Sequence, residues 1–170
     1  EKFSLSLTDA AFTATVYLQS ATFVGLLCGG LFADKLFLIT KASRLWIMAA
    51  SLLLSAPCLH GIGSLPSLQA TCIAAAAFGL FSGFFIGNVF PAAFEVVPGD
   101  TRASAVGLLN FFGALVSGFA PLVGGTWKET IGIEHMLAFT SYAYLAASIL
   151  LIVGIRTLYP LDFARAHGEL

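Results

Sequence analysis

The stretch that decides the fold is Ser67 to Phe94, which reads SLQATCIAAAAFGLFSGFFIGNVFPAAF and contains no Asp, Glu, Lys or Arg. A helix rises 1.5 Å per residue, so about 20 apolar residues are needed to cross the hydrocarbon core of a bilayer. Lipid offers backbone N–H and C=O groups no hydrogen-bond partner, which makes an α-helix the expected conformation. This stretch therefore predicts a transmembrane helix.

Four further stretches are also about long enough to cross a bilayer and lack charged residues. They are Ala10 to Ala33, Leu45 to Ile62, Ala103 to Thr126 and Met136 to Ile155. The connections between the five stretches are short, so neighbouring helices should run antiparallel, and no alternating pattern suggests barrel strands. The sequence thus predicts an all-α, polytopic membrane helix bundle of about five transmembrane helices.

The amino-acid composition also favours a lipid environment. Apolar residues make up 58% of the chain and charged residues 10%, with a mean hydropathy of +0.93, whereas soluble domains carry about 25% charged residues. The expected partner is therefore the lipid bilayer. A net charge of −1 argues against a nucleic acid partner, which needs a basic face. The three cysteines show no metal-binding spacing, so neither a metal nor a cofactor is predicted.

The orientation of the helices follows from the Lys and Arg residues in the short connections. One side carries Lys35, Lys41, Arg44, Arg102, Arg156 and Arg165, and the other carries Lys2 and Lys128. This difference predicts that the first of these sides, with the C-terminus, is cytoplasmic, and that the protein lies in the plasma (inner) membrane. The chain starts at Glu1 without a methionine, so it is interpreted as a fragment or as a chain trimmed at its front.

Glycines recur at helical spacing on two of the predicted spans. Gly79, Gly83 and Gly87 form one stripe, and Gly25 and Gly29 form another. Small residues at this spacing let helices approach closely inside a membrane. Two interpretations stay open: general bundle packing, and a smooth surface that slides during a conformational change.

Two segments resemble the major facilitator superfamily. Residues 30–35, GLFADK, are similar to the G-x-x-x-D-R/K opening of its cytoplasmic loop motif, although Phe37 and Leu38 replace the x-G-R/K continuation. Residues 102–113, RASAVGLLNFFG, followed by Gly118, Pro121, Gly124 and Gly125, resemble the penultimate helix of the anion:cation symporter branch. That branch carries sugar acids, aromatic acids and other organic anions.

The resemblance implies that the five spans correspond to helices 8–12 of a twelve-helix transporter. Residues 1–170 would then be a partial C-terminal half, whose partners are the missing N-terminal half and a small-molecule solute. The implied function is secondary active transport of an organic anion such as a sugar acid, by alternating access with proton or sodium coupling. The alternative is a non-transporting helical subunit of a membrane complex, which explains the helices but not the two motifs. An enzyme is not predicted, because the spans lack a cluster of catalytic side chains.

Polar residues inside the predicted spans are candidates for the substrate cavity, because burying them in lipid is unfavourable. Asn110 and Asn88 lie at a similar depth on the cytoplasmic side of their helices, and Gln19 and Tyr17 lie on the outer half of the first span. The alternative for the asparagines is a hydrogen bond between helices, and for Gln19 and Tyr17 an interfacial or packing role.

A second set of candidates lies at the cytoplasmic ends of the spans. These candidates for a cytoplasmic gating motif are Gly30, Asp34, Lys35, Arg44, Glu95 and Arg102. We expect Glu95 within salt-bridge distance of Lys35 or Arg44; a solvated fringe of charges is the alternative. The second and fifth spans hold few strongly polar residues and should face lipid, whereas the first, third and fourth should converge.

Overall fold

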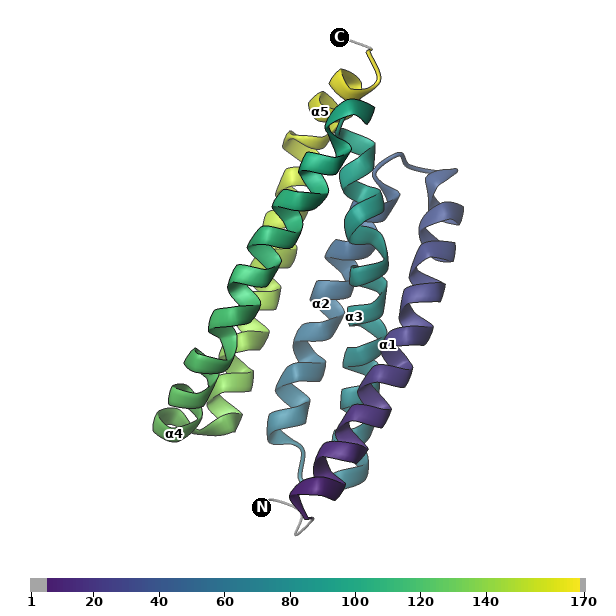
Figure 1. Cartoon of the computed structure of the whole chain (residues 1–170). Helices are drawn as coiled ribbons and strands as arrows, with labels where there is room; N and C mark the ends of the chain where they lie inside the picture. Colours follow the sequence, from purple (N-terminus) through teal and green to yellow (C-terminus); the bar gives the residue numbers. More distant parts are fainter. Residues whose placement is uncertain (1–5, 169–170) are drawn as a thin grey trace.

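The computed structural model describes residues 6–168, and in that range it contains helices and no strand. Figure 1 shows the elements as a bundle of long helices with the two chain ends at opposite ends of the bundle. The elements are α1 (Leu7–Phe37), α2 (Ser43–Ser64), α3 (Leu68–Val96), a 3₁₀ turn (Gly99–Thr101), α4 (Arg102–Thr157) and α5 (Tyr159–Ala166). The predicted all-α membrane bundle is confirmed. Lys2, which entered the orientation argument, lies outside the described residues.

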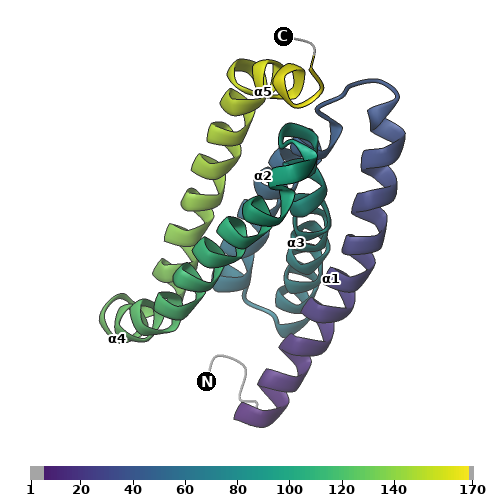
Figure 2. The same ribbon diagram turned by 45° about the horizontal axis from the view of Figure 1, so that its top comes forward.

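The helix α4 is two membrane-length arms joined at Gly132. A straight helix of 56 residues would be about 84 Å long, which is far more than the roughly 30 Å of a bilayer core. Gly132 has non-helical torsions, φ 79° and ψ 159°, and the chain turns back there (Figures 1 and 2). Within residues 6–168, four helices are long and apolar enough to span a membrane; because α4 turns back at Gly132, the bundle has five antiparallel segments.

The torsions of Gly132 predict a specific sensitivity to substitution. This region of φ and ψ is essentially restricted to glycine, so Gly132→Ala should destabilise the protein by about 1–3 kcal/mol. The thermal unfolding midpoint of the purified protein in detergent checks this. Gly125→Ala is the matched control, because Gly125 is helical and a Cβ there meets open space. Equal midpoints for the two variants would contradict the assignment of the turn to Gly132.

The closest helix pair is α1 with α3, and glycines make it possible. A Cβ on Gly83 would collide with the carbonyl oxygen of Thr22, and one on Gly25 with the carbonyl oxygen of Leu80. A Cβ on Gly29 would lie 2.7 Å from the Cα of Phe84. Backbone therefore lies against backbone along this interface, as the stripes predict. A sliding role for the same surface stays a prediction.

The position of α2 corrects the prediction that the second span faces lipid. This helix packs on α1, on α3 and on the second arm of α4 (residues 133–157), and holds the largest share of buried residues among the membrane-length helices. Small side chains allow this: Ser51, Ser55 and Ala56 are buried, and the Ser148 hydroxyl of the second arm donates to the Ala49 carbonyl at 2.8 Å. The helices α1 and α3 converge as predicted, but the first arm of α4 (residues 102–131) is largely exposed and does not join them, so the prediction is wrong for the fourth span.

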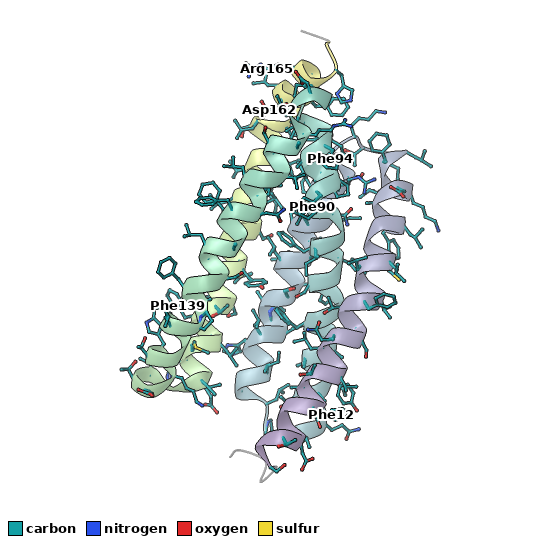
Figure 3. The ribbon with its side chains drawn as sticks, in the orientation of Figure 1. Phe12, Phe90, Phe94, Phe139, Asp162 and Arg165 are labelled. Carbon is teal, nitrogen blue, oxygen red and sulfur yellow. The ribbon has the colours of Figure 1, made fainter. Side chains whose placement is uncertain are left out.

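The short helix α5 lies across one end of the bundle (Figure 2). It packs on α3 and on the end of α4, at the end where the α1–α2 connection also lies (Figure 1). Its side chains Asp162 and Arg165, labelled in Figure 3, form an exposed ion pair of 3.8 Å. We call this end of the bundle the α5 end; most of the predicted gating residues lie there.

Candidate functional site

The candidate site is organised by Arg44, in the first turn of α2. Its guanidinium group donates to Asp34 Oδ1 of α1 at 2.8 Å, to Glu95 Oε1 of α3 at 3.0 Å and to Asn88 Oδ1 of α3 at 3.3 Å. A guanidinium group carries five N–H donors in a rigid planar fork. One side chain therefore joins the ends of three helices, and we call these four residues the Arg44 cluster.

The cluster is partly shielded from water. The side chains of Arg44 and Glu95 are 22% and 15% exposed, whereas that of Asp34 is 65% exposed. The Arg44–Glu95 pair is therefore the stronger of the two ion pairs, since exposed pairs contribute only about 0–1 kcal/mol. The expectation that Glu95 lies within salt-bridge distance of Lys35 or Arg44 is confirmed, with Arg44 as the partner.

Asn88 belongs to this cluster. It is fully buried, at 0% exposure, and its amide N–H₂ donates to the Phe84 carbonyl at 2.8 Å while its amide oxygen accepts from Arg44. Both ends of the amide are thus satisfied, which avoids the free-energy cost of a buried polar group. In this structure Asn88 takes the helix-to-helix role that the sequence left open.

Sequence reasoning missed Tyr159, the first residue of α5. Its side chain is 7% exposed, and its hydroxyl donates to the Lys41 carbonyl at 2.7 Å. Burial, together with the neighbouring Glu95 carboxylate, raises the pKa of the Tyr159 phenol above its ordinary value, so the phenol stays protonated. The only local sign of its role is that Tyr159 and a proline begin a short amphipathic segment. Nothing in that segment identifies Lys41, far earlier in the chain, as the hydrogen-bond partner.

The other gating candidates do not join the cluster. Arg102 donates to the Phe94 carbonyl at 3.1 Å and lies over the Phe94 ring, 5.5 Å from its centroid. Lys35 is exposed in the last turn of α1 and forms no ion pair with the residues that the structure describes. A Cβ on Gly30 would meet open space, so no close contact explains that glycine here.

The cavity candidates lie apart from the cluster. The side chain of Asn110, in the first arm of α4, is exposed and makes no hydrogen bond within the described part of the chain, and Cβ atoms on Gly107 and Gly113 would meet open space. Gln19 lines a pocket of about 420 Å³ that is shared with Thr22, Ser55, Ser82 and Tyr144. Tyr17 is half-exposed on α1. The structure does not bring these residues together with Asn110.

A family model described as Major Facilitator Superfamily matches residues 1–168, nearly the whole chain. The chain belongs to the Major Facilitator Superfamily. No curated protein and no solved structure matches it. The superfamily resemblance is therefore confirmed, and the protein is an integral membrane transporter of the major facilitator type.

Family membership gives the Arg44 cluster a context. In this major facilitator protein the segment similar to the family's loop motif, residues 30–35, supplies Asp34 to Arg44. The departure at Phe37 and Leu38 leaves the connection without a second glycine, and Phe37 instead lies under the Lys41 ammonium group, 4.4 Å from its ring centroid. The cluster therefore links the ends of three helices by ion pairs and hydrogen bonds.

Proposed function

We propose that the protein is a secondary active transporter that moves a small organic anion, such as a sugar acid, by alternating access with proton or sodium coupling. The observation that carries this proposal is the Arg44 cluster in a chain of the major facilitator family. Ion pairs between helix ends can break and re-form while each helix keeps its own hydrogen bonds. The cluster is thus suited to hold one state of a two-state bundle.

We further propose that the α5 end faces the cytoplasm of a cell with a plasma (inner) membrane. The described basic residues at that end include Lys35, Lys41 and Arg165, whereas Lys128 lies near the turn at Gly132. Basic connections favour the cytoplasmic side. On this assignment the Arg44 cluster, with Lys35, Arg102 and Gly30 around it, is the cytoplasmic gate.

The surface proposed for the solute is the exposed first arm of α4. That arm carries Asn110 between Gly107 and Gly113, and an amide supplies both donors and acceptors to a carboxylate or hydroxyl group. We propose that the chain is part of the C-terminal half, helices 8–12, and that an N-terminal half covers this arm. The predicted spans hold no Lys or Arg, so the positive charge for an anion would come from that other half. Gln19 and Tyr17 are the remaining cavity candidates.

Two asparagine variants test this assignment in the complete protein. Asn110→Ala should reduce uptake per molecule by about 10- to 100-fold, because a lost hydrogen bond to a charged solute is worth about 1.5–3 kcal/mol, and should leave membrane abundance unchanged. Asn88→Ala, the matched control, removes a buried amide that holds Arg44 and should lower abundance. The measurement is uptake against solute concentration, normalised to protein in the membrane. Reduced abundance with unchanged uptake per molecule for Asn110→Ala would show that this residue serves packing alone.

A further inference from the structure

The helix α5 is attached to the Arg44 cluster by a contact that crosses most of the chain. The Tyr159 hydroxyl donates to the Lys41 carbonyl at 2.7 Å, and Lys41 lies three residues before Arg44, just outside α2. The ring of Tyr159 is buried in a cluster with Ala42, Ala49 and Ile155. Tyr159 therefore fixes the segment from which Arg44 projects.

The aromatic face of α5 also borders the cluster. Tyr159 and Phe163 lie 5.5 Å apart between ring centroids, and Phe163 stacks on His167 at 4.1 Å. Phe163 and His167 line a pocket of about 290 Å³ together with Asp34, Phe37, Arg44 and Glu95. Ion pairs strengthen where water is excluded, so the position of α5 affects the strength of the Arg44–Glu95 pair.

The Tyr159 hydroxyl remains a hydrogen-bond donor to the Lys41 carbonyl over the ordinary pH range. Because burial and the Glu95 carboxylate raise the pKa of the Tyr159 phenol, its hydroxyl keeps its proton in the ordinary pH range and can continue to donate. The opposite face of α5 is exposed: Leu161 and Arg165 are exposed, and Asp162 and Arg165 pair with each other (Figure 3). The Tyr159 hydroxyl contact, the aromatic stack and packing on α3 and the end of α4 thus hold the helix in place.

We propose that α5 is a latch on the gate and that Tyr159 is its positioning residue, which holds the α1–α2 connection and thereby the guanidinium group of Arg44. This inference rests on the proposed role of the Arg44 cluster as a gate, and it assigns the regulation of that gate to the C-terminal helix. Release of Tyr159 frees the connection and lets Arg44 exchange partners.

The first test measures the contact itself, without reference to transport. Tyr159→Phe in the complete protein removes one hydroxyl and keeps the ring. Backbone amides of residues 38–46 should exchange with deuterium about 2- to 10-fold faster, as the loss of one hydrogen bond predicts. Tyr142→Phe is the matched control, because Tyr142 is 65% exposed and should change nothing. Unchanged exchange over residues 38–46 would overturn the latch.

The second test measures regulation in proteoliposomes. Because Tyr159 contacts the gate and not the solute, Tyr159→Phe should change the maximal rate more than twofold and leave KM unchanged. Faster exchange with an unchanged maximal rate, or a change in KM alone, would overturn the regulatory role. If the wild-type protein moves no solute, the proposed transport function fails, while the exchange result still decides the contact.

Discussion

Gly83→Leu is expected to remove most of the folded protein from the membrane. The Cβ of any residue at position 83 would collide with the Thr22 carbonyl oxygen and lie 2.7 Å from the backbone nitrogen of Leu26. Both are backbone atoms of α1, so the two helices must separate. Overpacking of a tight core costs about 1–3 kcal/mol and sometimes more, and the longer leucine side chain places the variant at or above the upper end. Membrane abundance and the thermal midpoint in detergent measure the effect.

Two alanine variants separate packing from a general intolerance of substitution. Gly83→Ala should already lower the midpoint, because the first carbon causes the collision. Gly113→Ala, in the first arm of α4, adds the same carbon where a Cβ meets open space, and its midpoint should not change. A Gly83→Ala protein as stable as Gly113→Ala would contradict the backbone contact between α1 and α3.

Arg44→Ala is expected to abolish most transport and to destabilise the bundle by about 2 kcal/mol. The substitution leaves Glu95, Asp34 and Asn88 without their shared donor, and hydrogen bonds to charged groups contribute about 1.5–3 kcal/mol each before solvent screening. Part of that free energy is lost to water, because Asp34 is mostly exposed. Urea or thermal unfolding measures stability, and normalised uptake measures transport.

The control for Arg44 is another arginine at the same end of the bundle. Arg165→Ala breaks an exposed pair with Asp162 and should change stability by less than about 1 kcal/mol. Arg44→Lys keeps the charge but not the planar fork, so it should restore only part of the stability. A double-mutant cycle of Arg44→Ala with Glu95→Gln should show coupling between the two residues. Additive effects would contradict a direct bond.

The parts of the fold that follow from local pattern could be predicted. Long runs without charged residues predicted the membrane-length helices. The helical spacing of five glycines predicted the surface where α1 and α3 touch, because a residue without a side chain is visible in the sequence: Gly25, Gly29, Gly79, Gly83 and Gly87. Asp34, Arg44 and Glu95 could be brought together because each lies at a span end on one predicted side of the membrane. The Arg44–Glu95 ion pair then requires only that the ends of α2 and α3 lie side by side.

The parts that depend on tertiary contacts could not be predicted. The sequence of α2 is mostly apolar, which led to the prediction that it faces lipid. In the structure Ser51 and Ser55 are buried, and Ser148 donates a hydrogen bond to α2 from far along the chain. These small polar side chains mark a helix interface. For Asn88 the sequence leaves a cavity role and a hydrogen bond between helices open, because nothing in it identifies Arg44 as the partner of the amide. Tyr159 was missed because its partner, Lys41, is 118 residues away.

The measurement that tests the central claim most directly is counterflow in liposomes that contain the purified complete protein. Liposomes are loaded with an unlabelled organic anion from a panel of sugar acids and aromatic acids, and are diluted into a trace of the labelled compound. An alternating-access carrier exchanges solute across the membrane without net charge movement. We expect transient accumulation of the label for at least one compound, saturable and strongly reduced by Arg44→Ala. No accumulation above empty liposomes for every compound, with and without proton and sodium gradients, would contradict organic-anion transport by this protein.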